Sequence, residues 1–194
     1  MPNICMDTVI FYVENDSELP MLQQLNEALE SCYPPGEYSG SAMAKLLHFL
    51  DIPTDGLYYR GDIIHYSLED DTIQLDCDSA WEPMQSAYEA LARHFGLKMV
   101  FSAEEIGCNL YYNSDEEGLY LDVRYKVYLS EKPTDGSLDE LFLSANGDTD
   151  FYFSDESEVL QWFQEKGNIH ASTLQNLREQ LDPDYIMIHE YTNP

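Results

Sequence analysis

The sequence predicts an α+β fold, because segments of alternating apolar residues are interleaved with segments whose apolar residues recur every three or four positions. The first 130 residues give the order strand, helix, short helix, strand, strand, helix, strand. A content of 44% hydrophobic and 13% aromatic residues can build a buried core, which disordered acidic chains lack. The length of 194 residues fits one large domain or two small ones.

The first strand is predicted over residues 6–13, which are rich in β-branched and aromatic side chains. Residues 15–31 begin with polar helix-capping residues and then place leucines at helical spacing, which predicts the first helix. We expect Pro34-Pro35-Gly36, within a loop over residues 33–40, to end this helix. Ser41 is then expected to cap a short helix that runs through Leu50.

The next four predicted elements complete the order of strands and helices of a known arrangement. Strands are predicted over residues 63–68 and 72–78, and the acidic turn Glu69-Asp70-Asp71 between them indicates a hairpin. Residues 84–95 place their apolar side chains on one helical face, and residues 98–102 are expected to form the next strand. This is the order of the split βαβ, or ferredoxin-like, sheet.

Extra antiparallel strands are expected to extend this sheet. Residues 108–113 and 119–129 are predicted to form a hairpin across residues 114–118, the second strand having a polar face. We therefore expect a ferredoxin-like domain over residues 1–130.

The last third of the chain, residues 131–194, is expected to be an extension packed on that domain, beginning with a loop over residues 132–138. Asn146-Gly147-Asp148 is a turn signal, so residues 141–143 and 151–153 are predicted as a hairpin. Two helices and a final strand are predicted after it: a helix capped by Ser154 and ending before Gly167, a helix over residues 172–181, and a strand over residues 185–191.

Two short motifs resemble a known family. The chain opens Met1-Pro2-Asn3-x-Cys5, and residues 75–83 read Leu-Asp-Cys-Asp-Ser-Ala-Trp-Glu-Pro before the helix over residues 84–95. This segment resembles the YubB-type ferredoxin-like domain of plasmid, phage and other mobile-element proteins. The chain departs from that pattern in lacking a second proline after Trp81, and the last 60 or so residues are not covered. The resemblance implies the fold and a mobile-element context, and it brings no catalytic residues.

The charge of the chain excludes several kinds of partner. The sequence contains 37 acidic and 9 basic residues, a net charge of −28. Residues 1–97 hold 17 acids and 3 bases, and residues 98–194 hold 20 and 6, so each half carries −14. Phosphate contacts need clustered Lys and Arg, so we expect no direct nucleic-acid binding and no docking on anionic membranes.

The cellular location expected from the sequence is the cytoplasm. No basic residue precedes the short apolar run over residues 8–13, so we expect no secretory signal. No apolar stretch reaches the roughly 18 to 20 residues that span a bilayer. Cys5, Cys32, Cys77 and Cys108 form no Cys-x-x-Cys pair and are expected to be reduced thiols.

No motif indicates an enzyme. Phosphate-binding glycine loops and the His-Glu-x-x-His motif are absent from the sequence, and the five histidines are far apart. Asp76 and Asp78 alternate with Cys77 and could hold a catalytic metal on one strand face, although a solvated sheet face explains them as well. Cys77 and His94 could form a nucleophile pair only if folding brought them together. We expect no catalytic residue, no metal and no cofactor.

The magnitude of the charge suggests a function. A globule of this length has a diameter of about 40 Å, and 28 charges correspond to about 48 Å of duplex DNA. Such self-repulsion destabilises a fold, and a cationic partner would relieve it. The candidate phosphate mimics are acidic residues that cluster in turns and on strands: Glu69, Asp70, Asp71, Asp76, Asp78, Glu104, Glu105, Asp115, Glu116, Glu117, Asp148, Asp150, Asp155, Glu156 and Glu158.

The sequence therefore predicts a non-enzymatic nucleic-acid mimic that inhibits a host defence nuclease or effector, of the anti-CRISPR or anti-restriction type. Tyr111, Tyr112 and Trp162 are the candidate hydrophobic anchors, because aromatic residues are enriched at interfaces. Three alternatives stay open: an acidic adaptor without mimicry, an acidic surface adapted to high salt, and a metal-dependent enzyme. The sequence leaves the oligomeric state open.

Overall fold

The computed structural model of the chain describes residues 3–32, 42–134, 136 and 138–194. The chain divides into two compact units, a first unit up to Asp115 and a second unit over Glu116–Asn193, so the division precedes the boundary near residue 130 that the sequence predicts. The loop expected over residues 33–40 and the cap expected at Ser41 lie outside the described residues. In the described part of the chain, no helix has the length and hydrophobicity to cross a bilayer.

The first unit contains five strands and three α-helices among its described residues. In chain order these are β1 (Ile4–Tyr12), α1 (Leu19–Cys32), α2 (Ala42–Phe49), β2 (Gly61–Glu69), β3 (Thr72–Ala80), α3 (Gln85–Phe95), β4 (Lys98–Glu105) and β5 (Leu110–Asn113). Short 3₁₀ helices, η1 (Asp16–Glu18) and η2 (Ile106–Cys108), precede α1 and β5. The strands and helices predicted up to residue 102 are present, most with slightly different ends.

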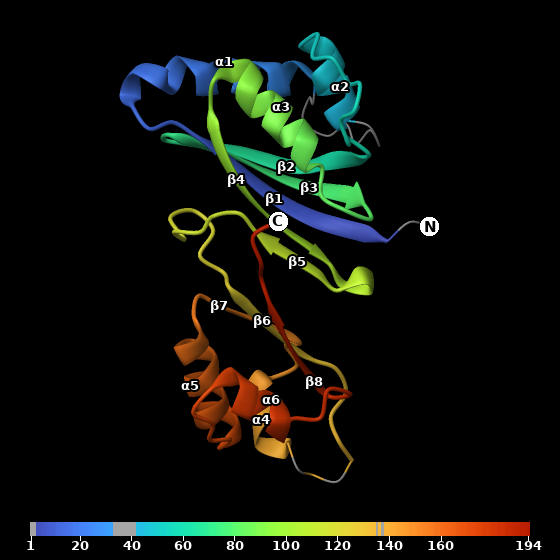
Figure 1. Cartoon of the computed structure of the whole chain (residues 1–194), viewed down its shortest axis with the longest axis vertical. Coiled ribbons are helices and arrows are strands. Elements are labelled where there is room, and N and C mark those ends of the chain that lie inside the picture. Colours follow the sequence, from blue (N-terminus) through green and yellow to red (C-terminus); the bar gives the residue numbers. More distant parts are fainter. Residues whose placement is uncertain (1–2, 33–41, 135, 137) are drawn as a thin grey trace. The chain divides into compact units, whose positions relative to one another are not determined.

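The sheet of the first unit is antiparallel throughout, with the order β2-β3-β1-β4-β5. Figure 1 shows α1, α2 and α3 on the same face of this sheet. The mixed α+β class is therefore confirmed. The hairpin predicted at Glu69-Asp70-Asp71 joins β2 and β3, and Gly96 ends α3 in the left-handed conformation at φ 70°.

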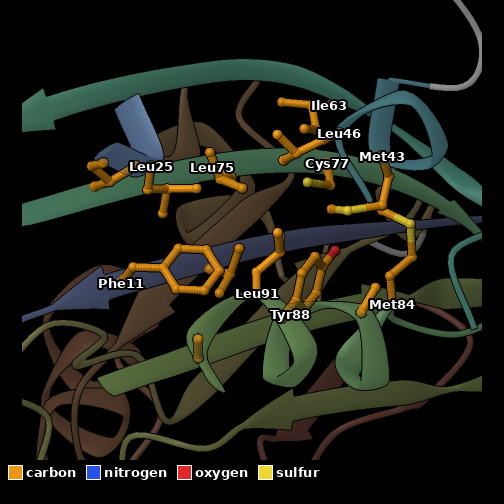
Figure 2. Packing of buried hydrophobic residues seen from close by; sticks show 14 of the residues in the cluster. Phe11, Leu25, Met43, Leu46, Ile63, Leu75, Cys77, Met84, Tyr88 and Leu91 are labelled. Carbon is orange, nitrogen blue, oxygen red and sulfur yellow. The ribbon is translucent and has the colours of Figure 1, made fainter. Parts of the chain in front are cut away.

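The core of the first unit lies between the sheet and its helices. Phe11 of β1, Leu75 of β3, Leu25 of α1 and Leu91 of α3 are all fully buried there (Figure 2). Burying each side chain of this size contributes about 1.5–3 kcal/mol. The inward side chains of the strands and the leucines on the inner faces of the helices therefore form one apolar layer.

The hairpin predicted between residues 108–113 and 119–129 is wrong. β5 pairs with β4 through Ser102 and Asn113, whereas the strand after residue 118 is short and belongs to the second unit. The Arg124 guanidinium donates hydrogen bonds to the backbone carbonyls of Leu121 and Val123. Residues 119–124 form no strand, and the first strand of the second unit begins at Tyr125.

The second unit pairs a small sheet with three helices. Its described elements are β6 (Tyr125–Leu129), α4 (Asp139–Ala145), β7 (Asp150–Phe153), α5 (Glu156–Gly167), α6 (Leu174–Gln180) and β8 (Ile186–Glu190). The sheet is antiparallel with the order β7-β6-β8. A separate buried cluster that includes Val127, Leu141, Val159, Phe163 and Leu177 holds it together.

The hairpin predicted across Asn146-Gly147-Asp148 is also wrong, because residues 139–145 form α4. Leu141 and Ala145 are four residues apart and both buried, which suits a helix that packs one face. Asn146 adopts φ 52° and ends the helix in the left-handed conformation. Asn146-Gly147-Asp148 therefore follows the end of α4 and is not the turn of a hairpin.

The two later helices and the final strand are present as predicted. The N-cap of α5 is Asp155, whose carboxylate accepts from the Glu158 N–H, whereas the sequence predicted Ser154. Gly167 is the last residue of α5, and Asn168 is its C-cap.

Candidate functional site

The sheet face opposite the three helices of the first unit carries a group of carboxylates. Asp76 and Asp78 of β3 lie half-buried on this face, whereas Cys77 between them is buried toward the helices. The expected shared orientation of the two aspartates is thus present. In the strand register Met6 of β1 lies opposite Asp78 on one side and opposite Glu104 of β4 on the other.

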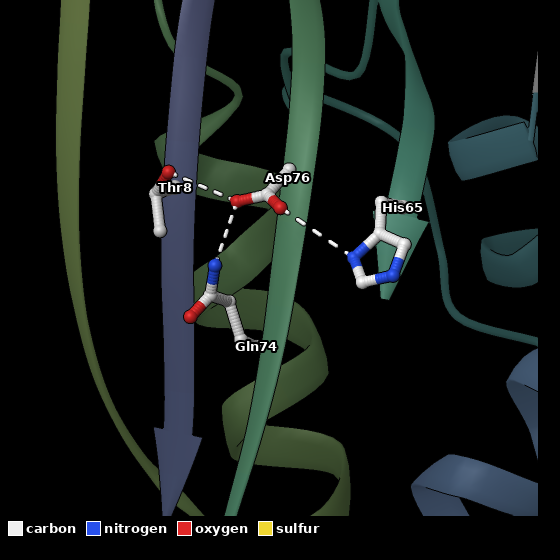
Figure 3. A network of polar contacts seen from close by, with 4 residues as sticks. All are labelled: Thr8, His65, Gln74 and Asp76. Carbon is white, nitrogen blue, oxygen red and sulfur yellow. Dashed lines mark hydrogen bonds and ion pairs between the residues drawn. The ribbon is translucent and has the colours of Figure 1, made fainter. Parts of the chain in front are cut away.

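Asp76 is engaged by its neighbours (Figure 3). Its Oδ1 atom accepts hydrogen bonds from the Thr8 hydroxyl at 3.1 Å and from the Gln74 amide at 2.9 Å. Its Oδ2 atom lies 3.6 Å from Nδ1 of His65 on β2. The contacts reach across three neighbouring strands, so they hold the Asp76 carboxylate in a fixed place on the sheet.

The turn between β2 and β3 presents three consecutive acidic side chains. Glu69, Asp70 and Asp71 are all exposed. Asp70 adopts φ 43°, a left-handed conformation that Asp tolerates better than most residues. The Thr72 hydroxyl donates to the Glu69 carbonyl, and the Val13 N–H donates to the Asp71 carbonyl. These bonds fix the backbone of the turn, and the three acidic side chains are exposed to solvent.

Glu105 has a structural role at the end of β4. Only 2% of its surface is exposed, and its carboxylate accepts from the backbone N–H groups of Gly107 and Cys108 in η2. The hydrogen bond from the Cys108 thiol lowers the pKa of Glu105, and the bonds from those N–H groups and from Asn3 add to this effect against the opposing effect of desolvation. Glu105 is therefore an ionised carboxylate enclosed by donors.

Several candidate acids of the second unit also stabilise local structure. Asp150 pairs with the buried Lys126 ammonium at 2.8 Å. Asp155 caps α5, Glu158 accepts from the Ser154 N–H, and Glu156 accepts from the Leu174 N–H at 2.7 Å. These carboxylates therefore stabilise the fold in addition to contributing negative charge.

The remaining candidate acids differ in exposure. Asp115 is buried at the end of the first unit. Glu116 is exposed and accepts from the Asn193 amide, and Glu117 and Asp148 are exposed.

The aromatic anchors expected from the sequence lie mostly inside the units. Tyr111 is 5% exposed and Tyr112 packs against the first core. Trp162 packs in the second core, with its ring centroid 4.7 Å from that of Phe151. By contrast, Trp81 is 47% exposed and has a left-handed backbone at φ 75°. An exposed tryptophan in this strained conformation is uncommon, so Trp81 is a further candidate for a hydrophobic anchor.

A buried polar cluster went unrecognised in the sequence. The Asp7 carboxylate of β1 is 2% exposed and accepts hydrogen bonds from the Ser79 hydroxyl, the Met84 N–H and the Tyr88 hydroxyl. Desolvation by burial raises the pKa of Asp7, although these donors oppose the shift. Asp7 occupies an inward position of β1 between Cys5 and Val9, and that break in the apolar alternation was the available signal.

The cysteines of this region are not activated nucleophiles. Burial is the main cause that raises the thiol pKa of both Cys5 and Cys77, so both stay protonated at neutral pH. The Tyr88 side chain is hydrogen-bonded to Cys77. His94 is exposed near the end of α3, where its ring makes an edge contact with Phe95. The structure thus gives Cys77 a tyrosine neighbour rather than the histidine considered in the sequence.

The charge is carried by both units. Residues 1–115 hold 20 acidic and 4 basic side chains, a net charge of −16, and residues 116–193 hold 17 and 5, a net charge of −12. Over the described ranges, no group of three or more His, Cys, Asp or Glu side chains has a geometry that could hold a metal ion.

No protein-family model matches this chain, and comparisons with curated proteins and with solved structures find no match.

Proposed function

We propose that the chain is a non-enzymatic acidic inhibitor that mimics nucleic acid and occupies the basic channel of a defence nuclease or CRISPR-type effector. The observation that carries the proposal is the acidic surface of the first unit. Here the exposed carboxylates of Glu69, Asp70 and Asp71 join the half-buried carboxylates of Asp76 and Asp78 along one hairpin. Residues two apart on a strand are about 7 Å apart, so a strand spaces its carboxylates regularly.

The proposed fold of the first unit is the ferredoxin-like split βαβ arrangement, with β5 as an added edge strand. Two observations support it: the sheet order β2-β3-β1-β4, and the location of α1 and α3 on one face of the sheet (Figure 1). The resemblance of residues 75–83 to the YubB-type family adds the expectation of a mobile-element origin. The four free thiols favour a reducing cytoplasm, where such a target would act.

The buried polar groups have a structural role, and this supports the proposal that the chain is not an enzyme. Asp7 is enclosed by three donors at the start of α3, and burial keeps the neighbouring Cys5 and Cys77 thiols protonated. Such a cluster fixes a helix on a sheet but offers neither an activated nucleophile nor an accessible base.

The test is a salt titration of binding against purified basic nucleases and CRISPR-type effectors, with duplex DNA and guide RNA as competitors. We expect affinity to fall by orders of magnitude between about 50 and 500 mM salt, and nucleic acid to compete. Binding that is indifferent to both salt and nucleic acid would overturn the proposal in favour of an adaptor.

A matched pair of variants locates the surface. The first neutralises the turn through Glu69→Gln, Asp70→Asn and Asp71→Asn. The second neutralises three exposed acids of the second unit through Glu165→Gln, Glu179→Gln and Asp184→Asn. Because both remove three charges, a tenfold or greater loss of affinity confined to the first variant assigns the contact to the turn. Equal losses would mean that only the net charge matters.

A further inference from the structure

A short segment at the end of β3 carries the exposed Trp81 side chain. This Trp81 segment, residues 79–84, runs from the last residues of β3 to the N-cap of α3. Trp81 itself has a left-handed backbone at φ 75°, which is rare for a bulky residue because the Cβ atom crowds the following carbonyl group. Strain of this kind persists only where the surrounding structure holds the chain in place.

One buried carboxylate joins the two ends of the Trp81 segment. Asp7 of β1 accepts a hydrogen bond from the Ser79 hydroxyl at 2.9 Å and another from the Met84 N–H at 3.1 Å. Gly61 of β2 packs against the same residues, because a Cβ atom at this position would lie 2.8 Å from the Cα atom of Ser79 and 2.9 Å from Cε of Met84. Both ends of the segment therefore have little room to move.

The middle of the segment is held through its backbone. The Ala80 N–H donates to the Arg60 carbonyl at 2.9 Å, and the Tyr58 hydroxyl donates to the Ala80 carbonyl. The Trp81 N–H donates to the Asn3 carbonyl at 3.0 Å. Because these contacts involve the backbone of the segment, they hold the strained conformation without using the indole ring.

The indole ring of Trp81 is left open. The residue is 47% exposed, and among the described residues no aromatic ring and no Lys or Arg side chain lies over it. Trp162 of the second unit differs, because its ring packs against Phe151 and Phe153. A large side chain that rigid backbone presents to solvent is pre-organised for binding, since little backbone freedom is lost when a partner contacts it.

The charge around Trp81 decides which partner fits. Residues 1–115 carry a net charge of −16, and Glu82, directly after Trp81, is exposed. A second copy of this chain, a nucleic acid or an anionic membrane would be repelled. A cationic side chain would be attracted both by the acidic surface and by the negative face of the indole, which binds cations better than the ring of Tyr or Phe.

We infer that Trp81 is the aromatic anchor of the acidic surface and that its indole ring binds the guanidinium group of an arginine side chain of a basic partner. Arginine fits better than lysine because its planar guanidinium is weakly hydrated and stacks on an aromatic face. This inference rests on the proposed function insofar as the partner is basic. It assigns the anchor to Trp81 in place of Tyr111, Tyr112 and Trp162, which lie mostly inside the units.

The test is an NMR titration of the ¹⁵N-labelled full chain with hexa-arginine and, separately, with hexa-lysine at equal ionic strength. The chain contains two tryptophans, so one indole N–H signal reports on each unit. We expect hexa-arginine to shift the indole signal of Trp81 and to leave that of Trp162 unchanged. Because the two peptides carry the same charge, the ratio of their affinities removes the general attraction of the acidic chain.

Trp81→Leu removes the aromatic face but keeps an apolar side chain. We expect the preference for hexa-arginine over hexa-lysine to fall about two- to fivefold in this variant. Tyr152→Leu is the matched control and should keep the wild-type preference, because Tyr152 is 48% exposed on the second unit and its ring already contacts Lys126. The indole titration of the wild type tests the contact without any substitution.

Two results would overturn the inference: equal shifts of the two indole signals, or a preference for hexa-arginine that is the same in the wild type and in Trp81→Leu. A Trp81 indole signal that moves with chain concentration alone would also overturn it, because a second copy of the chain would then cover the ring.

The inference and the proposed function can fail separately. If hexa-arginine contacts Trp81 but no basic effector binds the chain, the anchor stands and the proposed function fails. If an effector binds with strong salt dependence and Trp81→Leu binds it as tightly as the wild type does, the proposed function stands and the inference fails.

Discussion

The Tyr88 hydroxyl of α3 donates a hydrogen bond of 2.6 Å to the Asp7 carboxylate of β1. The same carboxylate accepts from the N–H of Met84, the N-cap residue of α3, at 3.1 Å. Ser79 of β3 contributes a third donor. Asp7 therefore fixes the start of α3 relative to two central strands, and it does so in the interior of the first unit.

Substitution of Tyr88 by Phe should lower the free energy of unfolding by about 1–3 kcal/mol. The ring would still fill its place in the core, but the buried Asp7 carboxylate would lose one donor, and an under-satisfied buried acceptor is costly. Urea unfolding followed by circular dichroism measures the change. Tyr152→Phe is the matched control, because Tyr152 is 48% exposed and its ring contact with Lys126 does not need the hydroxyl. A result for Tyr88→Phe as small as that of the control would show that this hydrogen bond is dispensable.

The raised pKa of Asp7 predicts a pH dependence with a defined sign. In the folded chain Asp7 holds its proton to higher pH than its ordinary value of 3.8, because burial disfavours the charge. Its contribution to stability is therefore greatest below pH 3.8 and falls as the pH rises through the folded pKa, by at most about 1.4 kcal/mol per pH unit. The neighbouring Cys5, Cys77 and Tyr88 groups also have raised pKa values and do not titrate in this range.

The measurement for Asp7 is the unfolding free energy of the wild type minus that of Asp7→Asn, from about pH 3.5 to 8 at constant ionic strength. The subtraction removes titrating groups that both proteins share. We expect the difference to decline with rising pH and then to level off. A flat difference, or one that grows with pH, contradicts the raised pKa.

The ion pair between Lys126 and Asp150 should give the stability a pH dependence of the opposite sign to that of Asp7. Burial raises the pKa of Asp150, but the hydrogen bonds from Lys126 and Thr149 and the charge of Lys126 lower it more. Its stabilising effect is therefore present above pH 3.8 and lost as the pH falls through the lower, folded value. Asp150→Asn should cost about 1–2 kcal/mol at pH 7, because the Lys126 side chain is only 3% exposed and would lose its counter-charge.

Asp139→Asn is the matched control for that pair. Asp139 lies 2.9 Å from Lys132, but both side chains are 45–49% exposed, so the loss should stay within about 0.5 kcal/mol. Thermal unfolding at pH 7 and pH 3 compares the two variants. If both variants lose the same stability, the burial of Lys126 does not increase the contribution of its ion pair to stability.

The left-handed backbone at Trp81 predicts a difference between two small substitutions. Trp81→Gly and Trp81→Ala both remove the side chain, but only Gly adopts φ 75° without steric cost. We expect the Gly variant to be about 1 kcal/mol more stable than the Ala variant in urea unfolding. Equal stabilities would mean that the local backbone relaxes, and the position would then store no strain.

The sequence by itself predicted the elements of the first unit up to residue 102, because their alternation and helical spacing are local patterns. The same patterns placed Asp76 and Asp78 on the face opposite Cys77, and the charge follows from composition alone. Of the strand predicted over residues 119–129 only residues 125–129 form a strand, and residues 141–143 lie in a helix instead of the predicted strand. Arg124 uses the backbone carbonyls of Leu121 and Val123, and Asn146 ends a helix.

The tertiary structure decided which acids also have a structural role. Glu105, Asp150 and Asp155 belong to acidic clusters in the sequence, yet each accepts a hydrogen bond that fixes a turn, a strand or a helix end. The Trp81 N–H donates to the Asn3 carbonyl, although the two residues lie far apart along the chain. Sequence periodicity reports which way a side chain points, whereas the partner it meets depends on the strand order and on where each strand ends.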